Sequence, residues 1–249
     1  MADLFDTLTP APGEAVGLAP DAWLLPGFAG TEAQALLADL LAVAEESPFR
    51  HLVTPGGATM SVAMTNCGGL GWISDRRGYR YEPVDPLTSR SWPTMPDRFL
   101  HLARRASDAA GFPGFAPDAC LINRYVPRSK LSLHQDRDEL DLDAPIVSVS
   151  LGLPAVFMFG GQARGACASR HRLQSGDVAV WGGASRLAFH GIAPLADGTH
   201  HLTGPFRYNL TFRKVTSDSG SGAVRSGKLP VVALSFLPEW EDKSAIPGI

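Results

Sequence analysis

The pattern of hydrophobic and polar residues changes near residue 119, from two helix-like segments to a series of short runs. Residues 31–46 are rich in Ala and Leu and open with Thr31-Glu32-Ala33-Gln34, which predicts a helix that begins with a capping box. Pro96 at an N1-like position and Gly111 after the last turn predict a second helix over residues 96–110.

Short runs of β-type composition follow from Ala119 onward, with turn residues such as Gly-Gly and Ser-Gly between them. Alternation of apolar and polar residues is clearest in the second and the last run. This pattern predicts a mainly β chain of the α+β class, an antiparallel sandwich or double-stranded β-helix (jelly roll) with helices packed outside. The predicted strands are residues 120–126, 146–151, 156–159, 177–181 and 208–215.

The remaining segments suggest how the chain is organised. Residues 1–20 mix Pro, Gly and acidic residues and are expected to be a loose lead-in to one domain over residues 21–215. Residues 50–95 carry many Gly, Thr, Ser and aromatic residues in short runs, which indicates a lid that reads the substrate. A Ser- and Gly-rich linker begins the tail of residues 216–249, whose role the sequence does not indicate.

Composition and charge narrow the class of protein. The chain is 45% hydrophobic and 19% charged, as expected for a globular protein. Its net charge is −3, so any nucleic acid would have to be bound by local patches of positive charge and by shape. The three cysteines lie far apart without a CxxC motif, which argues against a zinc finger or a disulfide scaffold. Without a signal peptide or a run of 18 apolar residues, we expect a cytoplasmic protein with no membrane span, and a monomer.

A metal site is the first candidate for chemistry. His134 and Asp136 are two residues apart, so on an extended segment their side chains point the same way. With a distant histidine such as His190 they make the two-His-one-carboxylate set that binds non-haem Fe(II) and leaves three positions for a co-substrate and O₂. The pair alone is a weak signal, because such spacing arises often by chance. Weaker candidates for the third ligand are His171, which lies between two arginines, and the neighbouring His200 and His201.

The segment of residues 207–213 is more specific. With a period of two, Arg207, Asn209, Thr211 and Arg213 share one face of a strand. Two arginines on an inward face are costly unless anions pair with them. Because guanidinium binds carboxylate bidentately, the two arginines are expected to hold the two ends of a small dicarboxylate such as 2-oxoglutarate. Asn123 and Tyr125, also two residues apart, are expected to donate hydrogen bonds to the same carboxylate. An edge strand with exposed arginines is the alternative.

Several longer stretches carry a resemblance to a known family. They read Ser47-Pro-Phe-Arg50, Val53-Thr-Pro-Gly-Gly57, Thr59-Met-Ser-Val-Ala-Met-Thr-Asn-Cys67, Leu70-Gly-Trp72, Pro117-Asp-Ala-Cys-Leu-Ile-Asn-Arg-Tyr125, Lys130-Leu-Ser-Leu-His-Gln-Asp136 and Ala144-Pro-Ile-Val-Ser-Val-Ser-Leu-Gly-Leu-Pro-Ala-Val-Phe157. Together, over about residues 20–215, they resemble the AlkB family of Fe(II)- and 2-oxoglutarate-dependent nucleic-acid demethylases. One departure is Ala58, where close relatives carry an aromatic residue.

The resemblance implies roles for the metal and co-substrate residues. It implies that His134, Asp136 and His190 bind the catalytic iron. It implies that Arg207, Asn123 and Tyr125 hold the distal carboxylate of 2-oxoglutarate, while Asn209 and Arg213 attend the end that chelates the metal.

The resemblance also implies a site for a flipped base. Trp72 matches the aromatic residue that stacks on the base and sandwiches it against His134, and Asp138 would contact the base edge with Glu139 nearby. An aromatic ring and carboxylates favour the cationic ring of a methylated base over a neutral base. The other residues expected to contact the substrate are Thr54, Met64, Tyr79, Lys130, Ser132 and Arg164.

The implied activity is direct reversal of alkylation damage. Hydroxylation of the methyl group of 1-methyladenine or 3-methylcytosine gives a hemiaminal that sheds formaldehyde, while 2-oxoglutarate becomes succinate and CO₂. The expected partners are single-stranded and double-stranded DNA, with RNA left open. Two other classes also stay open: a 2-oxoglutarate oxygenase that acts on RNA, a protein or a small molecule, and a non-catalytic binding module.

Overall fold

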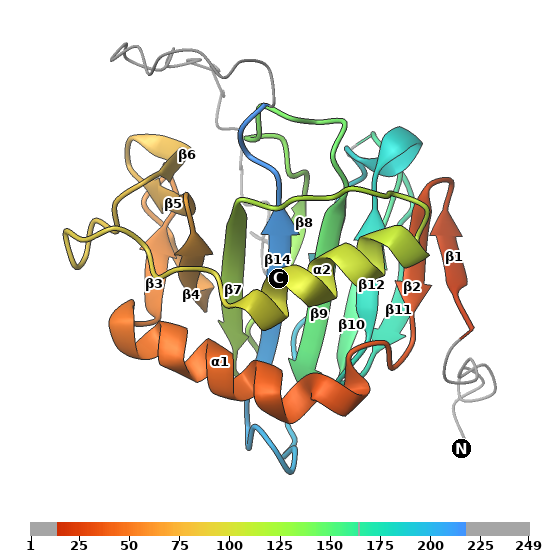
Figure 1. Ribbon diagram of the computed structural model, residues 1–249, viewed down its shortest axis with the longest axis horizontal. Coiled ribbons are helices and arrows are strands. Elements are labelled where there is room, and N and C mark those ends of the chain that lie inside the picture. Colours follow the sequence, from red (N-terminus) through yellow and green to blue (C-terminus); the bar gives the residue numbers. More distant parts are fainter. Residues whose placement is uncertain (1–13, 164, 218–249) are drawn as a thin grey trace, which may run out of the picture. The chain divides into compact units, whose positions relative to one another are not determined.

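A large antiparallel sheet of eight strands forms the centre of the fold (Figure 1). This computed structural model describes residues 14–163 and 165–217. Along the sheet the strands lie in the order β1 (Val16–Ala19), β2 (Ala22–Leu25), β12 (Val178–Trp181), β9 (Ile146–Gly152), β14 (Arg207–Arg213), β7 (Ala119–Tyr125), β4 (Thr59–Gly68) and β3 (Arg50–Val53).

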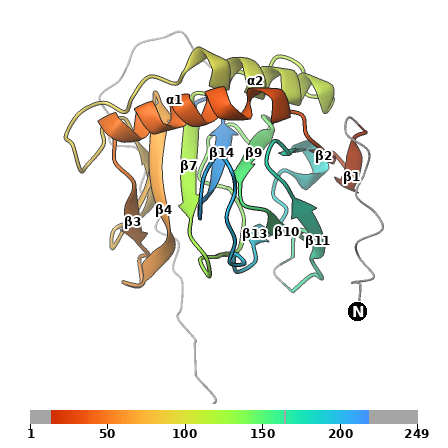
Figure 2. The same ribbon diagram turned by 90° about the horizontal axis from the view of Figure 1, so that it is seen from below.

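A second, smaller sheet and two helices lie on opposite faces of the large sheet (Figure 2). The helices are α1 (Ala33–Glu46) and α2 (Asp97–Ala109). The smaller sheet has the order β11 (Ser169–Leu173), β10 (Ala155–Phe159), β13 (His190–Ile192) and β8 (Leu131–His134). Two facing antiparallel sheets with helices outside are the double-stranded β-helix that the sequence predicted, and this prediction is confirmed.

Two hydrophobic clusters hold these layers together. One packs Leu36 of α1 and Phe99 of α2 against Phe212 of β14, and the other joins the two sheets through Phe157 and Trp181. The predicted alternation of β14 is confirmed, because its apolar residues enter the cluster beneath the helices. Its polar residues therefore face the smaller sheet, where the site lies.

The start of the first helix differs from the prediction. Residues Gly30–Glu32 form a 3₁₀ turn, α1 begins at Ala33, and no side chain caps it, so the predicted capping box is wrong. The carboxylate of Glu32 instead pairs with Arg105 of α2. The second helix is placed correctly, with Pro96 one position earlier than predicted, at the N-cap, and with Gly111 at a φ of 87°.

The segment boundaries also need correction. Residues 16–19, expected in a loose lead-in, form β1 and pair with β2, because an edge strand needs only one neighbour. Part of the predicted lid of residues 50–95 extends the large sheet as β3 and β4. Only β5 (Gly71–Asp75) and β6 (Gly78–Glu82) stand apart, as a two-stranded hairpin.

The predicted tail lies outside the described residues from position 218 onward. Among the residues that the structure does describe, no helix is long and apolar enough to cross a membrane.

Candidate metal and co-substrate site

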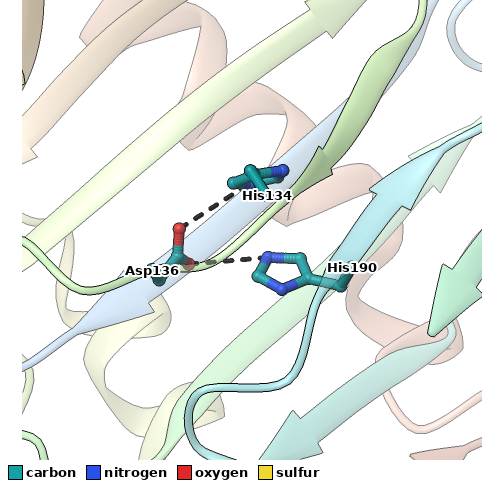
Figure 3. A group of neighbouring side chains, drawn as sticks. All are labelled: His134, Asp136 and His190. Atoms are coloured by element: carbon teal, nitrogen blue, oxygen red, sulfur yellow. Dashed lines mark ion pairs between the residues drawn. The ribbon is translucent and has the colours of Figure 1, made fainter. Parts of the chain in front are cut away.

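Three predicted ligands meet between the two sheets. His134 ends β8, Asp136 follows two residues later, and His190 begins β13, directly opposite His134 in the antiparallel pairing. Their ligand atoms lie within 4.8 Å of one another. The Asp136 carboxylate lies 3.6 Å from Nε2 of His134 and 3.7 Å from Nε2 of His190, and Figure 3 shows it beside both rings. The sequence prediction of this trio is confirmed as a geometric cluster.

The two imidazoles are held in the tautomer that a metal needs. Nδ1 of His134 lies 2.9 Å from the carbonyl oxygen of Ser132, and Nδ1 of His190 lies 3.1 Å from that of Ala188. A carbonyl oxygen can only accept, so each Nδ1 donates its proton there. Each Nε2 therefore presents its lone pair on the side of Asp136, which is how a metal-binding histidine is oriented.

Charge at the trio is set by burial and by one arginine. Burial alone would raise the pKa of Asp136, but the Arg213 guanidinium and the two histidines hold it well below its ordinary range. Nε and Nη2 of Arg213 donate to Oδ2 of Asp136 at 2.9 and 2.6 Å. Burial, followed by the neighbouring His134, lowers the pKa of His190 to about 3. An ionised carboxylate and a neutral imidazole at neutral pH are suitable ligands for Fe(II).

The stability of the metal-free protein is expected to fall as the pH drops from about 6.5 toward 3. The unfolded chain binds a proton at His190 in this window and the folded chain does not, so stability rises with pH there. The slope is at most about 1.4 kcal/mol per pH unit for one proton. Urea unfolding at several pH values measures it. His190→Gln should flatten this dependence, and His101→Gln on the exposed face of α2 should not; equal slopes in all three proteins would contradict the assignment.

A second set of predicted residues forms a buried cationic site at the other end of β14. Arg207 is only 1% exposed, and its guanidinium lies 4.9 Å from the ring of Tyr125, its partner across the sheet. One nitrogen, Nη2, donates to Ser150 Oγ at 3.0 Å. Nε and Nη1 of Arg207 and Oδ1 of Asn123 have no hydrogen-bond partner within the described chain. A buried cation with free donors is costly unless an anion binds it, so this site fits a carboxylate of 2-oxoglutarate.

The structure places Asn209 and Arg213 in different surroundings. Asn209 accepts a hydrogen bond from Asn123 at 3.2 Å and donates to Ser148 at 2.8 Å, and its contact with the co-substrate stays a prediction. The guanidinium of Arg213 does not converge with that of Arg207 but pairs with the metal-site carboxylate of Asp136. The contact of Arg213 with the co-substrate stays a prediction.

The residues predicted to bind the substrate occupy different surroundings. Trp72 of β5 stacks on Tyr79 of β6 with ring centroids 5.5 Å apart, and its Nε1 donates to Oδ2 of Asp138 at 3.0 Å. Tyr79 and Asp138 are exposed, as a substrate contact requires. Glu139, by contrast, is buried, and its carboxylate is held by Tyr81 and Arg186.

The remaining substrate candidates are spread over the molecule. Met64 is buried in the second cluster, opposite Asn123, because β4 belongs to the large sheet and not to an exposed lid. Thr54 lies in the turn between β3 and β4, where its hydroxyl accepts from the backbone of Ala58. Lys130 directly precedes β8 and Ser132 lies on it, both exposed, and Arg164 lies outside the described residues.

The competing histidines lie elsewhere. His171 is on β11, where its ring contacts the hydroxyl of Ser169 at 2.7 Å, and the tilted rings of His200 and His201 lie 4.4 Å apart in a separate loop. Two residues of the site had no signal in the sequence. Tyr81 is an ordinary alternating residue of a short hairpin, and Arg186 follows a 3₁₀ turn, so only their contacts with Glu139 reveal them.

Comparisons with known proteins agree with this donor set. A family model described as the 2OG-Fe(II) oxygenase superfamily matches residues 21–213. The alpha-ketoglutarate-dependent dioxygenase AlkB of Escherichia coli strain K12 is 61% identical over 197 residues, which cover 79% of this chain and 91% of the relative. The corresponding AlkB homolog of Caulobacter vibrioides is 46% identical over 196 residues, 78% of this chain and 86% of the relative.

A solved structure shares the fold. The structure of OsALKBH1 matches with a TM-score of 0.71 and 30% identity, covering 81% of this chain and 100% of that chain. The chain therefore belongs to the AlkB family of the 2OG-Fe(II) oxygenase superfamily.

Proposed function

We propose that this protein is an Fe(II)- and 2-oxoglutarate-dependent dioxygenase that oxidatively demethylates alkylated bases in nucleic acid, with 1-methyladenine and 3-methylcytosine in DNA as substrates. One observation carries the proposal. The trio of His134, Asp136 and His190 lies beside β14, whose Arg213 pairs with Asp136, and the same strand carries Arg207, a buried cation with free donors. A facial metal site and a carboxylate site are what this class of oxygenase requires.

The residues of the site have separable tasks. His134, Asp136 and His190 would hold the metal, and Arg207 with Tyr125 would hold the distal carboxylate of 2-oxoglutarate. Bound Fe(II), with O₂ and 2-oxoglutarate, supplies the oxidation that hydroxylates the methyl group and leaves succinate and CO₂. Formaldehyde is then lost from the unstable hemiaminal, and the unmodified base is restored.

Recognition of the base would fall to the β5–β6 hairpin and the segment after the metal carboxylate. A methyl group on the pairing edge is inaccessible in a duplex, so the base must leave the stack. Trp72 offers an aromatic surface, and the exposed carboxylate of Asp138, 3.0 Å from its Nε1, would favour a cationic base. This pairing supports a methylated base as the substrate more than a protein side chain.

The test is repair of a defined lesion. The protein is loaded anaerobically with Fe(II) and 2-oxoglutarate and exposed to air with single-stranded DNA that carries 1-methyladenine. Formaldehyde, succinate and restored adenine are measured by mass spectrometry, with unmethylated DNA and methylated RNA as parallel substrates. Stoichiometric repair of DNA is expected. Succinate without base repair would show an oxygenase with another substrate, and neither product with metal bound would show a binding module.

Replacing Trp72 by alanine is expected to weaken binding of the methylated oligonucleotide. Stacking of a base on an aromatic side chain contributes about 1–3 kcal/mol, or roughly 5- to 150-fold in affinity. Fluorescence anisotropy with Mn(II) in place of Fe(II) measures it without turnover. Trp23→Ala, at another partly exposed tryptophan on β2, is the matched control. Equal affinity of the Trp72→Ala and wild-type proteins would remove the stacking role.

A further inference from the structure

The β5–β6 hairpin is fastened to the segment that follows Asp136 by two facing aromatic residues. Trp72 and Tyr81 lie directly opposite each other in the hairpin, so their side chains extend from the same face. Trp72 donates to Asp138, and the hydroxyl of Tyr81 donates to Oε1 of Glu139 at 2.6 Å. Two neighbouring carboxylates thus hold the two partners of one cross-strand pair.

From Tyr81 the contacts continue to the metal-site carboxylate. Nη1 of Arg213 lies 3.5 Å from the Tyr81 hydroxyl, and its Nε lies 3.4 Å from Oε1 of Glu139. The same guanidinium donates twice to Oδ2 of Asp136. Arg213 is therefore shared between the hairpin and a predicted metal ligand.

Arg186 completes this network by contacting both Glu139 and the backbone of Asp136. Its Nη2 donates to Oε2 of Glu139 at 3.2 Å, and its Nη1 donates to the backbone oxygen of Asp136 at 2.8 Å. The two carboxylates and two guanidiniums are each less than 10% exposed, and their charges cancel. Buried charges that are fully paired resist rearrangement, because separating one charge from its partner costs several kcal/mol of free energy. A displacement of one side chain in this network therefore displaces its partners as well, because solvent does not replace the contacts.

Tyr81 is suited to act as a fixed donor in this network. Burial, reinforced by Glu139 and Asp136, raises its pKa well above the ordinary value despite the opposing charge of Arg213. The hydroxyl therefore keeps its proton at neutral pH, and it donates to the carboxylate while it accepts from Arg213.

We propose that Tyr81 is a positioning residue that couples the seating of a base on Trp72 to the orientation of the Asp136 carboxylate, and hence to metal binding. This inference rests on the proposed function, because it takes the hairpin to be the base-reading element. A base that stacks on Trp72 stabilises one position of the hairpin. Tyr81, the cross-strand partner, then holds Glu139 and Arg213 in the arrangement that presents Asp136 to the metal. Coupling of this kind is reciprocal, so bound metal also favours the hairpin position that accepts the base.

The test measures binding coupling without turnover. Mn(II) affinity is determined by quenching of tryptophan fluorescence, with and without an oligonucleotide that carries 1-methyladenine, in wild type and in Tyr81→Phe. In wild type the oligonucleotide is expected to tighten Mn(II) binding on the order of tenfold, within the usual range for linked sites. Tyr81→Phe removes one hydroxyl and keeps the ring, so the coupling should fall below about twofold while the affinity for oligonucleotide in the absence of metal changes little.

Tyr208→Phe is the matched control. Tyr208 is a buried tyrosine on the opposite face of β14, in the cluster beneath the helices, so its variant should retain the full coupling. Unchanged coupling in Tyr81→Phe, or none in wild type that binds and repairs the oligonucleotide, would overturn the inference. A lower metal-free melting temperature in Tyr81→Phe with coupling intact would reduce Tyr81 to a structural role. Failure of wild type to repair any methylated nucleic acid would instead overturn the proposed function.

Discussion

Asp136→Asn is expected to abolish formaldehyde release and to destabilise the metal-free fold at the same time. The substitution removes the anionic ligand. Replacing a residue that only hydrogen-bonds to a metal ligand already lowers metal affinity or activity 10- to about 100-fold, so the loss of activity here should exceed about 100-fold. It also leaves the buried Arg213 guanidinium without its closest carboxylate. Removal of one partner from a buried ion pair costs about 3–5 kcal/mol. Urea unfolding of the metal-free protein and a formaldehyde assay measure the two effects.

The matched control for Asp136→Asn is Asp143→Asn. Asp143 is exposed in the same segment, and its replacement should change neither activity nor stability appreciably. Wild-type affinity for Mn(II) in Asp136→Asn would exclude this carboxylate as a ligand. An unchanged free energy of unfolding would show that Arg213 finds another partner, Glu139 being the nearest.

Arg207→Met is expected to have opposite effects on co-substrate binding and on stability. Loss of a buried, hydrogen-bonded charge partner costs about 2–5 kcal/mol, so the affinity for 2-oxoglutarate should fall at least about 30-fold. The metal-free protein without co-substrate should become more stable, by about 1 kcal/mol or more, because a buried guanidinium with two unpartnered nitrogens is replaced by an apolar chain. Binding of 2-oxoglutarate should then no longer raise the melting temperature.

The sign of the stability change separates this explanation from simple damage to the core. A variant that lost stability together with co-substrate affinity would show that Arg207 is a structural cation whose partner is already inside the fold. Arg104→Met, on the exposed face of α2, is the control for removal of one positive charge and should alter neither quantity.

Short-range patterns determined much of the fold and the chemistry. The alternation of residues 207–213 correctly placed four polar side chains on one face of a core strand and the apolar ones on the other. The spacing of His134 and Asp136, with one distant histidine, correctly predicted the cluster of ligands. These predictions succeed because side-chain direction in a strand follows from a period of two, and ligand identity follows from residue type.

Some short strands were beyond the reach of the sequence, although the four-residue β12 was predicted from its apolar run between Gly176 and Gly182. β13 has three residues and β1 and β8 have four, too few for a period to emerge, and each is stabilised by its neighbours in the sheet. The same limit explains the division of residues 50–95, where only strand pairing decides that β3 and β4 join the large sheet and β5–β6 does not.

By itself, then, the sequence determined the fold class, the cluster of candidate metal ligands and the polar face of β14, all of which depend on residue type and local period. The tertiary structure alone decided which charges share the interior. It places Arg213 on Asp136 and buries Glu139 between Tyr81 and Arg186. These pairings join residues tens of positions apart in the chain. They are selected because a buried charge without a partner is too costly to leave unpaired, a condition set by the packed interior as a whole.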